Sequence, residues 1–251
     1  MNLMNYPLLV LAVSFVVQFL SAHIGDSVRN RVRALKEEER DDFGVVLGAT
    51  LTLLGLLIGF SFSMAVSRYD QRKNYEEAEA NAIGTEYVRA DLLPADDRSR
   101  VRELLKKYID QRVLFYITRN KQRLVTIDAD TAKLQNELWS AMRPRTAKET
   151  PLLALAVSGM NDVLNSQGYT QAAWRNRIPI AAWGLMVSIA ICCNLLIGYG
   201  ARVRDWRILL ILPVMVSITF FLICDIDSPS GGGIRVDPEN LLSLAHALRS
   251  Q

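Results

Sequence analysis

Three aspartates near the end of the chain carry the side chains best suited to binding a cation. Asp225, Asp227 and Asp237 lie in the stretch CDIDSPSGGGIRVDPEN, which begins where an apolar segment ends. Carboxylate oxygens are hard ligands of the kind that calcium and magnesium take. The interpretation that we favour is nevertheless structural: these aspartates cap the end of the apolar segment and pair with Arg235 or with another subunit. We therefore predict no metal site and no cofactor.

A different chemistry, the control of ion passage by apolar side chains, is suggested by the apolar segment 43–67. Leu56, Phe60 and Met64 follow one another at four-residue spacing, so they share one face of a helix. Repeated around an axis by several subunits, such residues would form apolar rings, and rings of this kind can gate a pore by dewetting. A position facing lipid or the protein core is the alternative that the spacing alone leaves open.

A stripe of small residues lies on the neighbouring face of the same segment. Its members follow at spacings of three or four: Gly48, Thr52, Gly55, Gly59 and Ser63. Glycines four residues apart let a neighbouring helix backbone approach closely. We interpret the stripe as helix packing, either within the subunit or between copies.

The helix predicted over 43–67 continues into a charged stretch without a proline or a turn signal. The segment itself contains no charged residue, which argues against a proton relay or a carboxylate-driven transporter. Beyond it, Arg68, Arg72 and Glu76 follow at four-residue spacing, which brings helical side chains within reach of one another, and Asp70 lies between the first two. We expect these charges to line a vestibule that lengthens the conduit and couples it to a soluble domain.

The residues give little indication of nucleic-acid binding or of enzymatic catalysis. The net charge of the 251-residue chain is only +3, so we predict no nucleic-acid partner. The two histidines, His23 and His246, lie far apart in the sequence, and no nucleophile, zinc or phosphate-loop motif accompanies them. The cysteines lie in apolar runs and are interpreted as packing residues. We therefore predict that the protein is not an enzyme.

Four apolar runs of about 20 residues are each long enough to cross a bilayer as a helix. They cover 6–24, 43–67, 179–200 (opened by Pro179) and 207–224 (with Pro213 inside). The insert between the second and third runs also has helical patterns. The predicted domains are 1–67 with two spans, 68–178 as a helical extramembrane insert, 179–226 with two spans, and 227–251 as an acidic turn and tail. The fold class is thus an all-α membrane protein.

Within the insert, helix signals recur along the chain. The second span is expected to run on to Leu93 and stop at Pro94. Asp96 or Asp97 is expected to cap the next helix, which has one apolar stripe. A further helix is expected near 128–142, ended by Pro144, and another from Thr150 and Pro151 to about Ser166, with Gly168 after it.

The distribution of basic residues among the loops bears on which side of the membrane the insert lies. An even number of spans puts both termini and the insert on one side. The short loop 25–42 carries five basic residues, and loop 201–206 adds Arg202 and Arg204, so the positive-inside rule favours these loops in the cytoplasm by a small margin. The family resemblance described next favours the opposite orientation.

Two stretches resemble the bestrophins. GFSFSMAVSRYDQRKNY has a Gly-Phe pair and, after seven residues, an Arg followed by an aromatic residue. The segment after the last span resembles the acidic, Pro, Gly and Asp-Pro pattern of bestrophins. It also fits D-x-P-x-x-G-x-x-R-V-x-P, which is typical of a bacterial family of bestrophin-like membrane proteins of unknown function, distantly related to the bestrophin channels.

The resemblance implies a homopentameric ion channel whose pore is lined by the second span. Phe60 matches the neck aromatic, and Leu56 and Thr52 fall where the two preceding rings would be, although Thr52 is not bulky and apolar. The family's topology places the insert and both termini in the cytoplasm of a bacterium with the spans in its inner membrane, and we adopt this orientation. The implied partners are the lipid bilayer, four further copies of the chain and small inorganic ions.

Two other functions remain as alternatives. The protein could be a non-conducting scaffold or sensor whose insert binds a partner protein, while the spans anchor and oligomerise it. It could also be a stator-like, force-transducing unit, although such units use an intramembrane carboxylate that these spans do not supply.

Overall fold

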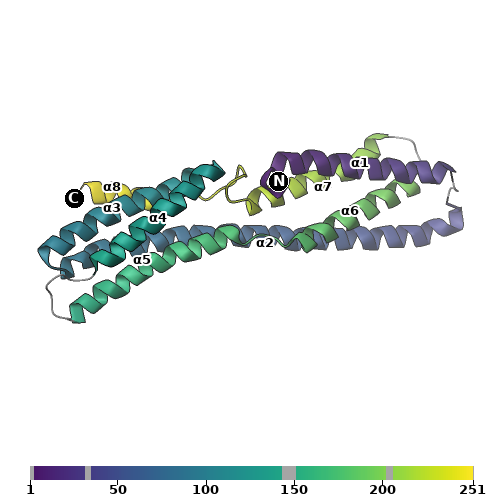
Figure 1. Ribbon diagram of the computed structural model, residues 1–251. Coiled ribbons are helices and arrows are strands. Elements are labelled where there is room, and N and C mark those ends of the chain that lie inside the picture. The colour runs from purple at the N-terminus through teal and green to yellow at the C-terminus, as the bar shows by residue number, and fades with distance from the viewer. Residues whose placement is uncertain (1–2, 32–34, 143–150, 202–205, 251) are drawn as a thin grey trace. The chain divides into compact units, whose positions relative to one another are not determined.

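The described part of the molecule is mostly helical. The computed structural model describes residues 3–31, 35–142, 151–201 and 206–250, and no strand occurs among them. The longer helices, seen in Figure 1, are α1 (Pro7–Arg31), α2 (Arg40–Arg89), α3 (Ala95–Ile117), α4 (Lys121–Ala141), α5 (Pro151–Arg175), α6 (Ile180–Gly200), α7 (Trp206–Asp227) and α8 (Glu239–Arg249). Short 3-10 helices occupy Leu3–Asn5, Glu37–Glu39 and Ala90–Leu92. Among the described residues, four helices are long and apolar enough to cross a membrane, and the predicted all-α membrane fold is confirmed.

The helices extend beyond the apolar runs that predict the spans. α1 continues through polar residues to Arg31, and α2 begins at Arg40, so the connection between them is shorter than 25–42. Pro179, which opens the third predicted span, is the N-cap of α6. Pro213 lies inside α7, as expected. Helix ends thus depend on capping and packing as well as on apolar length.

Several predicted boundaries in the insert are wrong. The N-cap of α3 is Pro94, and Asp96 and Asp97 lie in its first turn, where their charge favours the helix dipole without capping it. α4 begins at Lys121, well before 128, because the Asn120 side chain accepts hydrogen bonds from two backbone N–H groups. α5 runs past Gly168 to Arg175. Pro144 and Thr150 lie outside the described residues.

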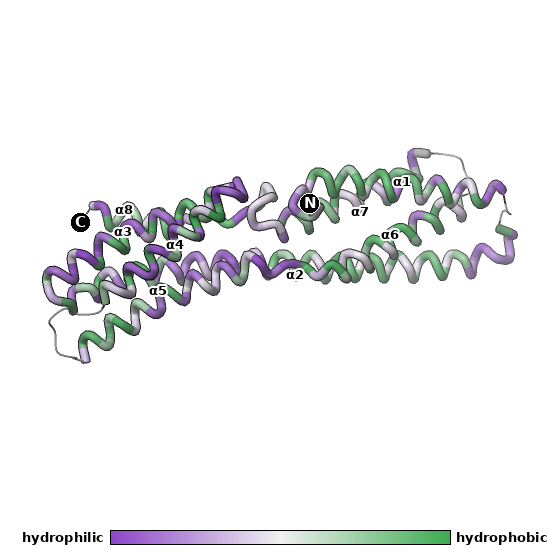
Figure 2. Tube along the Cα trace, in the orientation of Figure 1, coloured by the Kyte–Doolittle hydropathy of each residue, from purple (hydrophilic) through white to green (hydrophobic). Residues whose placement is uncertain are grey.

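The chain divides into two compact units. The span unit comprises Met1–Arg68 and Arg177–Arg235, and the helical unit comprises Tyr69–Asn176 and Val236–Gln251. The hydropathy trace in Figure 2 is mostly apolar along α1, α6 and α7 and mixed along α3, α4 and α5. α2 contributes to both units, since its residues up to Arg68 belong to the first and those from Tyr69 to the second.

In the span unit, α1 packs against α6 and α7 at very close range. A Cβ added to Gly198 would lie 1.9 Å from the Ala22 carbonyl oxygen, and one added to Gly25 would lie 2.2 Å from that of Leu195. Buried amides link the three helices: Asn194 donates to Gln18 (3.1 Å), and Gln18 donates to Ser217 (3.2 Å). Such hydrogen bonds hold helices together where the surroundings are apolar.

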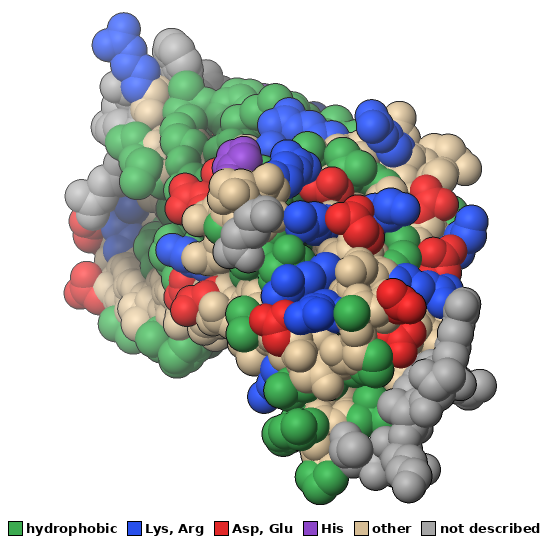
Figure 3. Space-filling view, turned by 90° about the vertical axis from the view of Figure 1, so that its left-hand side faces the viewer, with side chains coloured by type: hydrophobic (Ala, Val, Ile, Leu, Met, Phe, Trp, Pro, Cys, Tyr) green, Lys and Arg blue, Asp and Glu red, His purple; other side chains and the backbone are tan. Residues whose placement is uncertain are grey.

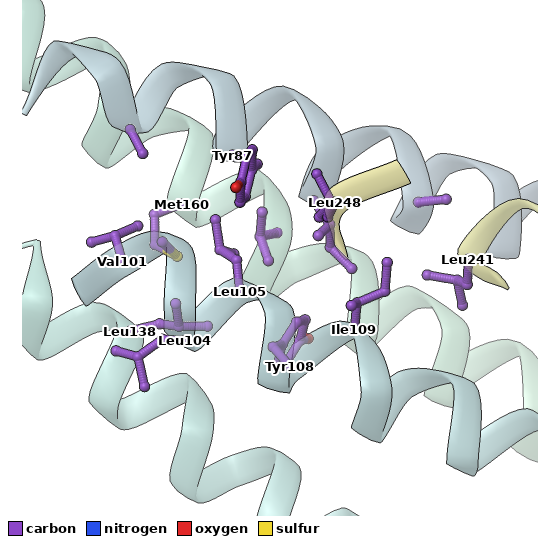
Figure 4. Packing of buried hydrophobic residues seen from close by; sticks show 14 of the residues in the cluster. Tyr87, Val101, Leu104, Leu105, Tyr108, Ile109, Leu138, Met160, Leu241 and Leu248 are labelled. Atoms are coloured by element: carbon purple, nitrogen blue, oxygen red, sulfur yellow. The ribbon is translucent and has the colours of Figure 1, made fainter. Parts of the chain in front are cut away.

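In the helical unit, an apolar core lies among α2, α3, α4, α5 and α8. Figure 4 shows its centre, where Leu105 and Ile109 of α3 lie toward Tyr87 of α2 and Leu248 of α8. The segment expected as a tail therefore contains a helix that completes this core. Acidic and basic side chains are interspersed across the face of this unit seen in Figure 3, as on a solvated surface.

Candidate pore helix and acidic turn

The four predicted ring residues lie on an exposed face of α2. Leu56 is 53% exposed, Phe60 65% and Met64 38%, and Thr52 is exposed as well. The Thr52 hydroxyl donates to the Gly48 carbonyl of its own helix (2.9 Å). Its hydrogen atom is therefore not available to another partner on this face. Among the described residues, these side chains do not belong to a core of the single chain.

The small-residue stripe is also open. A Cβ added at Gly48, Gly55 or Gly59 would meet no atom within 4 Å among the described residues, and Ser63 is exposed. Packing within the subunit, one of the two interpretations of this stripe, therefore does not account for it. Contact between copies of the chain is the interpretation that remains for this stripe. The close helix contact inside the chain uses Gly25 and Gly198 instead, which the sequence analysis missed, although small residues four apart (Ser21 and Gly25) mark the place.

The charges that follow the span have specific partners. Arg68 forms an ion pair with Asp227 of the span unit (3.5 Å), and Asp70 is exposed. Arg72 and Glu76, expected to line a vestibule, are 2% and 1% exposed. The Glu76 carboxylate accepts hydrogen bonds from the Leu241 backbone (2.9 Å) and the Asn240 side chain (2.7 Å). It thereby caps the N-terminus of α8, where negative charge is favourable.

The acidic segment forms a tight turn at the end of α7. The Asp225 carboxylate accepts hydrogen bonds from the backbone N–H groups of Gly233 and Ile234, both at 2.8 Å. A Cβ added at Gly232 would lie 2.3 Å from the Asp225 carbonyl oxygen, so glycine is required there. Asp227 accepts from the Ile178 backbone N–H (3.2 Å), while Arg235 is half-buried and Asp237 is exposed.

These contacts give the first two aspartates structural roles. Each binds backbone N–H groups that have no other partner in a regular helix or sheet, and Asp227 adds the ion pair with Arg68. Within the described residues, no three His, Cys, Asp or Glu side chains lie close enough to hold a metal ion. The geometry is that of a carboxylate-stabilised turn.

A buried polar cluster in the helical unit was missed by the sequence analysis. Glu79 of α2 and Arg112 of α3 are both 0% exposed and form an ion pair through two contacts. The Thr170 hydroxyl of α5 donates to Glu79 at 3.0 Å. Burial, reinforced by the Glu79 charge, raises the pKa of nearby Tyr116 and Tyr108 far above the ordinary tyrosine value, so both stay neutral.

A family model described as Bestrophin-like domain matches residues 9–241. Two crystal structures of variants of a bacterial bestrophin homologue from Klebsiella pneumoniae are similar. One is 13% identical with a TM-score of 0.64, covering 97% of this chain and 99% of that chain. The other is 14% identical with a TM-score of 0.66, covering 96% and 97%. None of the curated proteins matches the chain.

Proposed function

The chain belongs to the Bestrophin-like family, whose known members are ion channels, and we propose that it forms a homopentameric ion channel with its pore lined by α2. Thr52, Leu56, Phe60 and Met64 would supply successive rings of the neck. Because these side chains are uncharged, the neck would control passage by its width and by dewetting rather than by charge.

The observation that carries this proposal is the exposure of the second span. Only 6% of the most apolar stretch of the helix that contains it is buried within the chain, compared with 44% for the last span. Contact with lipid would explain why such a helix is apolar. It would not explain why Gly48, Gly55 and Gly59 form an open stripe beside the ring residues. Close contact between copies of α2 around an axis uses both faces.

The test is single-channel recording of the purified protein in planar bilayers under asymmetric salt, together with its mass in detergent. Discrete openings from a pentamer are the expected result, and the reversal potential gives the sign of the permeant ion. A well-formed oligomer that stays silent over varied pH, calcium and voltage would favour the scaffold or sensor function instead. A monomer would remove the pore altogether.

The orientation is proposed with the function: the spans lie in the inner membrane of a bacterium, and the insert and both termini are cytoplasmic. To test this orientation, a cysteine is introduced at the exposed Glu77 of the helical unit, and its labelling by a membrane-impermeant thiol reagent is measured. We expect labelling in inverted vesicles and none in intact spheroplasts. The reverse pattern would place the insert outside, as the positive-inside rule favours.

A further inference from the structure

One face of α2 carries three glutamates into the interior of the helical unit. Glu76, Glu79 and Glu86 follow at spacings that keep them on one helix face, and they are 1%, 0% and 0% exposed. Glu76 caps α8, and Glu79 pairs with Arg112 and Thr170. Glu86 differs: among the described residues, neither of its carboxyl oxygens has a hydrogen-bond partner.

The surroundings of Glu86 are tightly packed, and the Arg89 side chain lies beside it, since a Cβ added at Gly159 would also lie 2.5 Å from Arg89 Nη1. Along the chain, Glu86 lies between the buried Ile83 of α2 and the buried Ala90 of the following 3-10 helix. Opposite it is Gly159 of α5, where an added Cβ would lie only 2.0 Å from the Glu86 Oε2 atom. Met160 of α5, next to that glycine, is fully buried in the same core. The absence of a side chain at position 159 thus makes the space that the carboxyl group occupies.

A carboxylate in such a place is unfavourable in its charged form. Burying an ionised group without hydrogen-bond donors is strongly unfavourable, whereas burying a neutral carboxylic acid is much less so. We propose that Glu86 is a proton-binding site of the helical unit, neutral when α2 and α5 are packed together, and that loss of its proton loosens this contact.

Two charged groups face Glu86 from the helices packed there. Burial has the largest effect and raises the pKa of Glu86 from 4.5 to about 8; Arg89 of α2 opposes this rise, and Asp162 of α5 adds to it. The folded protein therefore keeps this proton up to about pH 8, while the unfolded chain releases it near the ordinary glutamate value. Unfolding releases a proton between these two values, so stability falls as pH rises through that window and levels off above it.

The test compares wild type with Glu86→Gln, which keeps the shape of the protonated form and cannot ionise. Thermal unfolding in detergent is followed at about pH 6 and about pH 9. We expect the wild-type Tm to fall by about 3 °C or more between the two, and the Glu86→Gln variant to lose most of this fall. Glu77→Gln, an exposed position on the same helix, serves as the matched control and should behave as wild type.

The chain has two histidines, His23 and His246, which also titrate over part of this range. The variant separates their effect from that of Glu86. An equal fall in Tm in wild type and Glu86→Gln would overturn the proposal.

Two further readouts use the intact protein and do not depend on conduction. Infrared difference spectra should show the carbonyl band of a protonated carboxylic acid near neutral pH that disappears in Glu86→Gln. If that variant does not fold, hydrogen exchange of the wild type decides the matter, corrected for the intrinsic effect of pH. Protection of the α2 and α5 backbone around Glu86 and Gly159 should fall above about pH 8. Protection that is unchanged with pH, or no such infrared band, would contradict the proposal.

Discussion

At the scale of single residues, the environment of a side chain decides its role. Phe60 and Phe62 are two residues apart in α2, yet only Phe60 continues the four-residue series of Leu56 and Met64. Arg112 and Arg249 both pair with acids, but the Arg112–Glu79 pair is fully buried, whereas Arg249 and Asp110 are exposed. Each contrast supplies a variant and its own control.

Replacing Phe60 by alanine should widen the proposed neck. We expect Phe60→Ala to raise the single-channel conductance or to make openings less regulated, with the oligomer intact, because a large apolar ring is removed from the narrowest part. Planar-bilayer recording and mass in detergent measure both. Phe62→Ala, also exposed, should leave the current near the wild-type level. An unchanged current in Phe60→Ala would remove Phe60 from the neck.

Breaking the buried ion pair should destabilise the helical unit strongly. Arg112→Met leaves the Glu79 carboxylate buried without its charged partner, and we expect a loss of about 3–5 kcal/mol in the free energy of unfolding. Arg249→Met removes an exposed pair and should cost at most about 1 kcal/mol. Denaturant or thermal unfolding in detergent measures the difference. Similar losses in the two variants would show that burial of the pair has no energetic consequence.

At the scale of elements, glycines divide into those that permit contacts within the chain and those that face open space. Gly198 and Gly25 allow α1 and α6 to approach, while a Cβ added at Gly184 of α6 would meet no atom within 4 Å in the part of the chain that the structure describes. The capping of α8 by Glu76 is a second such contact between elements, because it fixes where the last helix begins against α2.

A single methyl group should therefore have opposite effects at two glycines of α6. Gly198→Ala forces the Ala22 carbonyl away, so we expect a loss of about 1–3 kcal/mol in stability. Gly184→Ala meets no neighbour and should gain up to about 1 kcal/mol from helix propensity. The two variants can be compared by unfolding in mixed micelles. A stable Gly198→Ala would contradict the close α1–α6 contact.

At the scale of the whole molecule, the exposed second span is a surface that a single chain leaves uncovered. An apolar helix with an open glycine stripe is consistent with a neighbour in the assembly. The folding of one chain and the association of several copies should then respond to different substitutions.

Gly59→Leu should separate these two properties. A leucine at this open position leaves the contacts within the chain untouched, so helix content and thermal unfolding of the monomer should be retained. Between copies it would hold the backbones apart, and we expect most of the protein to lose the oligomeric mass in detergent. Gly184→Leu, equally open but on α6, should keep that mass. A Gly59→Leu oligomer of normal size would place the contact between copies elsewhere.

The fold class, the number of spans and the helical insert follow from the sequence alone. A backbone in lipid must satisfy its own hydrogen bonds, so apolar runs of sufficient length can only be helices, and their order sets the architecture. The same local periodicity places Leu56, Phe60 and Met64 on one face of α2, but it does not decide whether that face is exposed. A structural role for Asp225 is the interpretation that the sequence favours, but the sequence does not indicate that its carboxylate binds the N–H groups of Gly233 and Ile234.

Only the tertiary structure decided which charged residues are buried and with what they pair. Nothing in the local sequence distinguishes the buried Glu76 and Glu79 from the exposed Glu77. Their partners, Leu241 and Arg112, are remote in the sequence. Contacts of that kind leave no mark in spacing or periodicity. For the same reason, the sequence alone would suggest that Glu86 is a surface residue. Only the tertiary structure shows that it packs against Gly159. Local physics sets each helix, and only packing brings distant side chains together.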